Sequence, residues 1–162
     1  MGKLQTVLSI EDADWRSPDA QSCLDAYFAE LESRFPGGFD RMAGGASALE
    51  DYAAPNGCLL LARNEGQPIG CGALRTIAAG VGEIKRMWVS PQARGLGVGR
   101  QLLEALERCA RERRMHTVRL DTNASLREAL NLYRVAGYRE IERFNDNPYA
   151  QHWSEKTLGP LP

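Results

Sequence analysis

Three glycines alternate with apolar residues just after a predicted strand and just before a predicted helix. The segment consists of Arg94, Gly95, Leu96, Gly97, Val98, Gly99 and Arg100. Glycines let backbone N–H groups converge on a ligand because no side chains stand in the way. Those groups lie at the positive end of the helix dipole, and an arginine stands at either end of the segment. The pattern predicts a site for a pyrophosphate or another polyanion.

Two common nucleotide-binding patterns fit this segment poorly. A Walker loop needs Gly-Lys-Ser/Thr after the turn, whereas Gly99 is followed by Arg100 and Gln101. A dinucleotide fingerprint needs its third glycine where Arg100 stands. Asp121 lies near the distance expected of the ribose-binding acid, but the glycine spacing does not match. A different phosphate-bearing ligand is favoured.

The glycine segment and its flanking blocks together resemble one enzyme family. The spacing of residues 94–99 is similar to the acetyl-CoA signature of the GNAT superfamily, Arg/Gln-x-x-Gly-x-Gly/Ala. Residues 83–91 look like the family's fourth strand, and residues 129–138 resemble its second motif, often Ala-x-x-Leu-Tyr-x-x-x-Gly-Phe/Tyr. Residues 34–39 and 145–149 also resemble a bacterial GNAT subgroup of unassigned substrate. The resemblance implies the GNAT fold and acetyl-CoA as cofactor.

The resemblance also implies which residues hold acetyl-CoA. In the family, the fourth strand splays from the fifth, and the pantetheine lies in the cleft between them. Met87, Trp88 and Val89 are therefore expected to line the cleft, with main-chain contacts from Met87 and Val89. Residues 94–100 are expected to hold the pyrophosphate. Many relatives carry an asparagine three residues before the second motif; this chain does not, and Asn123 is the candidate to replace it.

Acetyl transfer to an amine requires a proton acceptor and a proton donor. A lysine-like amine has a pKa of about 10.4 and attacks a thioester only when it is neutral. The resemblance places Glu83 where some GNAT enzymes have the general base, and Tyr133 where the family often has the general acid. The alternatives are a strand-end carboxylate paired to Lys85 or Arg86, and a tyrosine packed on the core.

The four cysteines bear on both the mechanism and metal binding. Cys23, Cys58, Cys71 and Cys109 are scattered without a Cys-x-x-Cys pair, and the chain has two histidines. This favours reduced, mostly buried thiols in a reducing cytoplasm, and no metal site. None of the cysteines lies in a motif-like setting, so direct attack in a ternary complex is favoured over an acyl-cysteine intermediate.

Two segments outside the cofactor motifs are candidates for the acceptor site. Residues 32–40 and 144–149 combine aromatic and charged side chains with Pro or Gly, which suits a pocket wall as well as an ordinary loop. Arg34, Arg75 and Arg86 are suited to bind a carboxylate, which favours an amino-acid-like acceptor. Aminoglycoside-like acceptors, polyamines and protein N-termini stay open. The candidate acceptor-binding residues are Phe28, Arg34, Phe35, Arg86, Asn145 and Tyr149.

Hydrophobic periodicity predicts the elements that position these residues. A helix is expected to begin with Ser17 as N-cap and Pro18 at its first position, and to end at residues 36–38. Further helices are expected near 46–52, from Val98 onward, and at 125–136. Strands are expected at 4–10 (closed by Glu11 and Asp12), 58–63, 68–77, 83–89, 117–121, 138–144 and 152–158, with a hairpin turn at 64–67. The predicted fold is α+β: a GNAT fold with a mixed central sheet of about six to seven strands, about four flanking helices, and a cofactor cleft between splayed fourth and fifth strands.

Length and composition limit the remaining possibilities. The chain of 162 residues is expected to form a single domain over residues 1–162. Its net charge of −1 argues against nucleic acid and membrane surfaces as partners. The N-terminus turns polar at Glu11, which predicts no signal peptide and a cytoplasmic location. Many relatives are dimers, so the resemblance also implies a possible homodimer.

The predicted function is acetyl transfer from acetyl-CoA to a primary amine of a small molecule. A non-catalytic acyl-CoA-binding sensor module is the alternative, because it would keep the glycine segment and dispense with Glu83 and Tyr133. A nucleotide-binding regulator is disfavoured by the loop spacing. Release of free thiol in the presence of an amine distinguishes the enzyme from the sensor.

Overall fold

The computed structural model describes residues 8–40 and 49–159. Its centre is a seven-stranded mixed sheet with the order β1-β2-β3-β4-β5-β7-β6. Neighbouring strands are antiparallel except for β4 and β5, which are parallel. The strands are β1 (Leu8–Asp12), β2 (Gly57–Asn64), β3 (Gln67–Ala78), β4 (Val81–Val89), β5 (Thr117–Thr122), β6 (Arg139–Ile141) and β7 (His152–Thr157).

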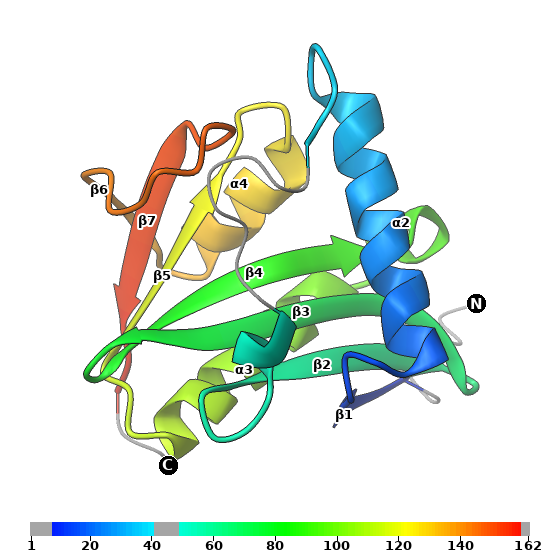
Figure 1. The fold of residues 1–162 in the computed structure, drawn as a ribbon, viewed down its shortest axis with the longest axis horizontal. Coiled ribbons are helices and arrows are strands. Elements are labelled where there is room, and N and C mark those ends of the chain that lie inside the picture. The colour runs from blue at the N-terminus through cyan, green and yellow to red at the C-terminus, as the bar shows by residue number, and fades with distance from the viewer. Residues whose placement is uncertain (1–7, 41–48, 160–162) are drawn as a thin grey trace.

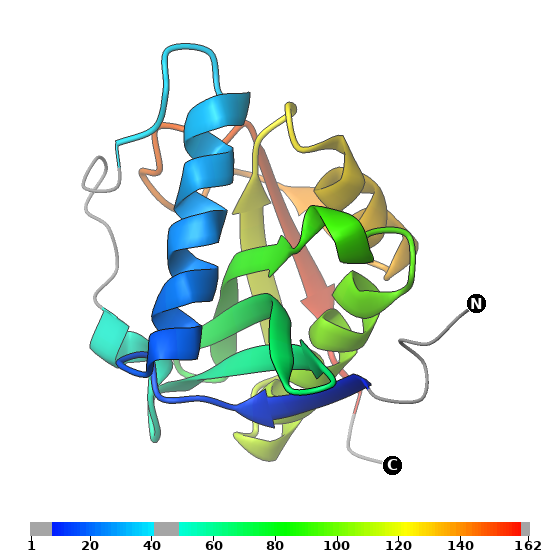
Figure 2. The same cartoon turned by 90° about the vertical axis from the view of Figure 1, so that its right-hand side faces the viewer.

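Helices cover both faces of this sheet (Figures 1 and 2). α2 lies on one face, and α3 and α4 lie on the other. α2 begins as predicted, because Ser17 Oγ accepts a hydrogen bond from the N–H of Ala20 at 3.3 Å and Pro18 stands at the first helical position. The helices are α2 (Pro18–Arg34), α3 (Val98–Glu112) and α4 (Arg127–Val135), with the 3-10 helices η1 (Leu49–Tyr52) and η2 (Pro91–Ala93).

The sheet divides the apolar core into two clusters. Leu59 and Leu61 of β2 pack on the side of α2, whereas Leu60 and Ala62 pack on the side of α3. Because both faces of β2 are covered, its sequence is an unbroken apolar run rather than an alternating one. The apolar stripe of α3 completes the larger cluster. Its buried members are Val98, Leu102, Leu103, Leu106 and Ala110.

β4 and β5 separate after a short parallel pairing, which ends at Glu83 and Arg119. The register between β3 and β4 shifts between Cys71 and Ala73, and Arg86 in β4 has a φ of 60°. Such a bulge bends a strand and increases its twist. The far end of β4 accordingly turns away from β5 (Figure 1). This is the splay of the fourth and fifth strands that the sequence predicted.

Most of the predicted elements are confirmed. The hairpin turn at 64–67 is a tight one, in which Glu65 and Gly66 have φ values of 52° and 81°. The described ranges contain no helix long and apolar enough to cross a bilayer. The strands predicted at 58–63, 68–77, 83–89, 117–121 and 152–158 are β2, β3, β4, β5 and β7, and the helices predicted from Pro18, from Val98 and at 125–136 are α2, α3 and α4.

Two predictions at the start of the chain differ from the structure. Glu11 and Asp12 were expected to close the first strand, but both continue β1 because they pair with Leu61 and Leu60 of β2. The helix expected near 46–52 is the 3-10 helix η1 in its described part. Residues 4–7 and 46–48, which belong to the same two predictions, lie outside the described residues.

The strand predicted at 138–144 is too long. β6 covers Arg139–Ile141 and pairs with β7. Beyond it, Arg143 Nε donates a hydrogen bond to the carbonyl of Asn145 at 2.9 Å, and Asn145 Oδ1 accepts one from Trp153 Nε1 at 2.9 Å. Such side-chain hydrogen bonds compete with a strand ladder. The segment that follows is therefore irregular, and it carries side chains toward the centre of the sheet.

Candidate functional site

The glycine segment joins the end of β4 to the start of α3. Gly95 and Gly97 have φ values of 80° and 83°, a left-handed conformation that glycine adopts without strain. Gly97 is the N-cap of α3. The first N–H groups of a helix have no partners within the helix, so the start of α3 presents free donors. A Cβ at Gly95 or Gly97 would meet no atom within 4 Å, which shows open space beside the segment.

A cavity of about 460 Å³ lies against this segment, bordered by α2, the end of β4 and α4. Two residues predicted to bind the cofactor lie outside its lining: Leu96, which is 49% exposed, and Asn123. The side chain of Asn123 donates to the carbonyl of Tyr149 and accepts from the N–H of Ser125, each at 2.8 Å. The other predicted residues line the cavity: Met87, Trp88, Val89, Arg94, Gly95, Gly97, Val98, Gly99 and Arg100. We call this space the cofactor cavity.

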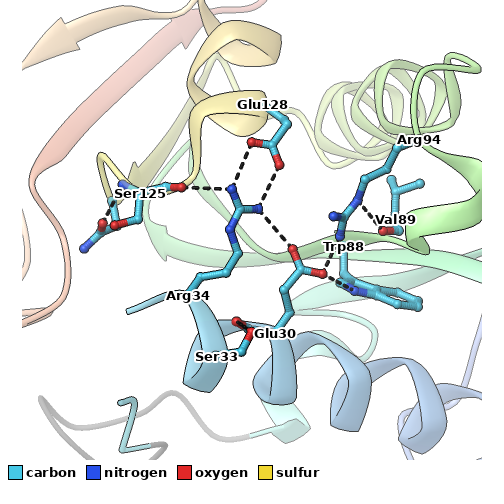
Figure 3. Close-up of polar contacts among 9 residues, drawn as sticks. Glu30, Ser33, Arg34, Trp88, Val89, Arg94, Ser125 and Glu128 are labelled. Atoms are coloured by element: carbon cyan, nitrogen blue, oxygen red, sulfur yellow. Dashed lines mark hydrogen bonds and ion pairs between the residues drawn. The ribbon is translucent and has the colours of Figure 1, made fainter. Parts of the chain in front are cut away.

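An ion-pair network ties α2 to α4 beside the cofactor cavity (Figure 3). Arg34 donates to both carboxylate oxygens of Glu128, at 2.8 and 3.0 Å, and to the carbonyl of Ser125 at 2.9 Å. It also pairs with Glu30 at 3.1 Å. The Arg34 guanidinium lowers the pKa of Glu128 to about 2. Arg34 was predicted to bind the acceptor, but in this structure its guanidinium is engaged by residues of the chain itself.

Glu30 extends the network to the glycine segment (Figure 3). It pairs with Arg94, and it accepts a hydrogen bond from Trp88 Nε1 at 3.2 Å. Arg94 Nε also donates to the carbonyl of Val89 at 3.0 Å. The cofactor cavity therefore has an acidic residue in its wall, and one of its two predicted arginines is engaged by that residue.

A second, smaller cavity of about 90 Å³ adjoins the cofactor cavity. Phe35, Arg86 and Tyr149, which were predicted to bind the acceptor, line it, whereas Phe28 and Asn145 do not. Phe39 lines the same wall, and its ring lies tilted against that of Tyr149, with 4.6 Å between the ring centres. Six residues line both cavities: Tyr27, Leu31, Met87, Leu126, Ala129 and Tyr133. We call the smaller space the acceptor cavity.

The polar end of the acceptor cavity is formed by Asp121, Lys85 and Asn147. Asp121 Oδ1 accepts a hydrogen bond from Asn147 Nδ2 at 3.1 Å, and Lys85 Nζ lies 3.6 Å from Oδ2. Glu83 lies behind them at 1% exposure, paired with Arg75 at 2.8 Å. Glu83 was predicted as the general base, and the structure places it near this cavity but not in its lining.

Arg86 is the buried cation of the acceptor cavity. Its guanidinium lies over the rings of Phe28 and Tyr52, at 5.0 and 5.7 Å from their centres. Its Nε is buried and has no hydrogen-bond partner among the described residues. A buried N–H without a partner costs free energy, and an anionic group in the cavity would supply one. Phe28 thus contacts Arg86 but does not line the cavity.

Tyr133 of α4 stands where the two cavities meet. It is 7% exposed, and its ring contacts that of Tyr138 at 5.8 Å between centres. Burial raises the pKa of Tyr133 well above its usual value, and the nearby Tyr27 and Asp121 add to the effect. The hydroxyl is therefore protonated at neutral pH, as a proton donor must be.

Sequence reasoning missed several residues of the acceptor cavity. Asp121 and Lys85 had been considered only as a ribose-binding acid and as an ion-pair partner, Tyr27 had no assigned role, and Phe39 was named only as part of residues 32–40. The alternation of β5 offered one signal: Val118 and Leu120 are buried in the core, so Asp121 belongs to the opposite face. Nothing in the sequence shows that this face meets the segment around Asn147.

The absence of a metal site stays a prediction. One group among the described residues, Asp12, Cys58 and Cys109, places its potential ligand atoms within 4.8 Å of one another. Their positions in β1, β2 and α3 explain why cysteine spacing did not reveal the group. None of the three lines the cofactor or acceptor cavity. Three ligands, one from an exposed carboxylate, fall short of the four of a structural zinc site.

Comparisons with known proteins agree with this geometry. The family model described as "Acetyltransferase (GNAT) family" matches residues 5–138. A protein of Azospirillum brasilense named "IAA acetyltransferase" is 39% identical over 102 residues, which cover 62% of this chain and 65% of that protein. The chain spans less than two thirds of the length of the first curated relatives that it matches.

Solved structures share the fold over nearly the whole chain. A protein of Klebsiella pneumoniae described as an acyl-CoA N-acyltransferase is 29% identical, with a TM-score of 0.76, and the match covers 94% of this chain and 98% of that one. The PaiA N-acetyltransferase of Thermoplasma acidophilum, solved in complex with coenzyme A, is 14% identical with a TM-score of 0.71, over 93% of this chain and 99% of that one. At this identity the second likeness concerns the fold alone.

Proposed function

Since this chain belongs to the GNAT acetyltransferase family, we propose that it transfers an acetyl group from acetyl-CoA to a primary amine of a small molecule. The observation that carries the proposal is the junction of two cavities. The larger lies against the glycine segment, the smaller holds a carboxylate and two cations, and Met87 and Tyr133 belong to both. A donor in one cavity and an acceptor in the other would meet at this junction.

The residues of the cofactor cavity fit acetyl-CoA. The open space at Gly95 and Gly97 and the free N–H groups at the start of α3 suit a pyrophosphate. Beyond Glu83, the edge of β4 that faces β5 has no pairing among the described strands, so its main chain is available to an amide-bearing ligand. The volume of about 460 Å³ lies in the range of small-molecule sites. Acetyl-CoA, the donor substrate, supplies the thioester that the amine attacks.

The acceptor cavity favours a small amine that also carries a carboxylate. Arg86 and Lys85 offer positive charge, and Asp121 offers negative charge for an ammonium group. A cavity of about 90 Å³ has room for about six to nine water-sized groups, which suits an amino-acid-like molecule better than an aminoglycoside. Arg34 would join the acceptor only if its pairs with Glu30 and Glu128 opened.

Direct attack in a ternary complex fits this arrangement. The four cysteines line neither cavity, so the site offers no thiol for an acyl intermediate. The Tyr133 hydroxyl, at the junction, is the candidate to give a proton to the departing sulfur. Glu83 as general base, a cytoplasmic location and a homodimer stay predictions.

The alternative is a sensor module that binds acyl-CoA without turnover. One experiment separates it from the enzyme: release of free thiol from acetyl-CoA is followed with a panel of amino acids, aminoglycosides and polyamines. Thermal unfolding with acetyl-CoA, ATP or NAD runs in parallel, because a ligand at 100 times its Kd stabilises a fold by about 2.7 kcal/mol. Thiol release with an amino acid supports the proposal. A stabilising shift with acetyl-CoA and no release with any amine would support the sensor.

A further inference from the structure

We propose that Asp121, rather than Glu83, accepts the proton that the acceptor amine must lose. This inference rests on the proposed function and concerns the same site. Both carboxylates lie on the face of the sheet opposite the larger core cluster. Glu83 precedes Ile84 in β4, and Asp121 follows Leu120 in β5, and both of these apolar neighbours are buried in that cluster. The two acids are therefore neighbours across the splay, and the structure distinguishes them by their access to the cavity.

Access to the acceptor cavity favours Asp121. Asp121 lines the cavity and keeps 10% of its side chain exposed. Glu83 lines neither cavity and keeps 1%. A general base must come within hydrogen-bond reach of the proton that it removes, directly or through one water. Asp121 is open to an acceptor in this cavity, whereas Glu83 is separated from the cavity by other side chains.

The two carboxylates also differ in the charge of one hydrogen-bond partner, a guanidinium for Glu83 and a neutral amide for Asp121. Arg75 binds one oxygen of Glu83 at 2.8 Å, and Asn145 and Lys85 face its other oxygen at 3.1 and 3.6 Å. Both oxygens of Glu83 are thus turned toward other side chains of the protein.

One oxygen of Asp121 is bound only by a neutral amide among the described residues. Its Oδ2 accepts from Asn145 at 2.6 Å and faces Lys85, whereas Oδ1 accepts one hydrogen bond among the described residues, from Asn147. A carboxylate oxygen has two acceptor sites, so Oδ1 of Asp121 retains one, as Oε1 of Glu83 does, but only Asp121 lines the cavity. Asn145 and Lys85, which also contact Glu83, hold Asp121 in place. Arg75 pairs with Glu83 alone of the two carboxylates.

The proton balance of the transfer assigns each group a step. The acceptor ammonium gives one proton to Asp121 Oδ1, which passes it to water. The lone pair of the neutral amine then forms the C–N bond as the C–S bond of the thioester breaks. Acylation makes the nitrogen strongly acidic, so it gives its second proton to water. The sulfur takes a proton from the Tyr133 hydroxyl, which water restores. One proton is released in all, and no oxidant or reductant is needed.

The test compares Asp121→Asn with Glu83→Gln on two acceptors. One acceptor is the best amine of the panel, and the other is its alkoxyamine analogue, whose nitrogen is already neutral at neutral pH. Asp121→Asn is expected to lower kcat/KM for the amine by about 10²–10⁴-fold but to lower it by less than about tenfold for the alkoxyamine, which needs no base for its first proton. Glu83→Gln is expected to affect both acceptors alike, as a structural group would.

The stabilising shift with acetyl-CoA confirms that each variant folds and binds the donor. If Asp121→Asn does not fold, the same comparison is made with Asp121→Glu, which displaces the carboxylate by one methylene. Equal losses with both acceptors in the Asp121 variant would overturn the proposal, as would a selective loss in Glu83→Gln alone. Absence of turnover in the unmodified protein would instead remove the proposed function on which this inference rests.

Discussion

The two cavities are built in opposite ways. The groups of the cofactor cavity that we propose to bind the pyrophosphate come from one continuous segment, and they belong largely to the backbone between Gly95 and Gly99. The acceptor cavity takes its chemistry from side chains of α2, β4, β5 and the segment around Asn147. Backbone donors are fixed by local conformation, whereas the side chains depend on how distant elements pack.

This difference predicts different sensitivities to mutation. A change in the glycine segment should alter donor binding through backbone conformation and leave the acceptor untouched. A change in the acceptor cavity should alter turnover or acceptor selectivity and leave donor binding untouched. Tyr133 lines both cavities, so its substitution tests the step at which donor and acceptor react.

The largest expected effect is that of Tyr133→Phe. Loss of the hydroxyl should lower kcat by about 10²–10⁴-fold with little change in the affinity for acetyl-CoA, because the proton is needed only when the sulfur departs. Tyr138→Phe is the matched control: Tyr138 is buried beside Tyr133, lines neither cavity and donates to Glu107 at 2.8 Å. It should lower stability by about 1–3 kcal/mol and keep kcat. Similar kcat values for both variants would contradict a role for Tyr133 in proton transfer.

Arg86→Gln should act on the acceptor alone. Loss of a charge-assisted hydrogen bond of about 1.5–3 kcal/mol raises KM by about 10–150-fold for an acceptor that carries a carboxylate. KM for the corresponding amine without the carboxylate should change little. Steady-state kinetics with both acceptors measure this, and Arg139→Gln, at an exposed position in β6, is the control variant. An equal rise in KM for both amines would show that Arg86 supports the fold of the cavity and does not bind the carboxylate.

Gly97→Ala should act on the donor alone. The left-handed conformation at φ 83° costs alanine about 1–2 kcal/mol. If the variant segment relaxes to another conformation when acetyl-CoA is absent, binding must restore the left-handed one, and the affinity falls by this cost. We expect the Kd for acetyl-CoA to rise by about 5–30-fold in calorimetry. Gly66→Ala carries the same strain at φ 81° in the β2–β3 turn and should leave the Kd unchanged. Equal Kd values for both variants would argue against backbone recognition by this segment.

The smallest expected effect concerns the bridge between Arg34 and Glu128. The pKa of Glu128 is lowered from 4.5 to about 2, so the bridge stabilises the fold above about pH 4.5 and loses its contribution as the pH falls toward 2. Glu128→Gln should therefore reduce stability at neutral pH by less than about 1 kcal/mol and flatten its dependence on pH in that window. Unfolding in urea at several pH values measures this. Glu142→Gln, at an exposed position, is the control, and an equal flattening there would assign the effect to other carboxylates.

Most of the residues predicted to bind the cofactor line one cavity because they form one continuous segment. Arg94 to Arg100 follow a strand and open a helix, and the glycine spacing determines their conformation. Even in this cavity, an ion pair between residues far apart in the sequence could not be predicted. The contact of Glu30 with Arg94 joins α2 to the glycine segment across 64 residues, and no pattern in the chain indicates it.

The acceptor cavity was predicted less completely because its geometry depends on packing. Resemblance pointed to Tyr133, which lines the cavity, and to Glu83, which does not. Asp121 comes to line the cavity where β4 bulges at Arg86 and separates from β5. Arg34 was chosen as a carboxylate ligand for its charge, and the structure shows it paired with Glu128, 94 residues away. Residue type predicts what a side chain is able to bind, whereas tertiary packing determines what it does bind.

The joined cavities are tested most directly by initial rates of thiol release at crossed concentrations of acetyl-CoA and the best amine acceptor. Direct transfer requires both substrates to occupy the protein at once, so double-reciprocal plots should give lines that intersect. Parallel lines would indicate that the acetyl group leaves the donor before the amine binds. That result would contradict a ternary complex at the junction of Met87 and Tyr133.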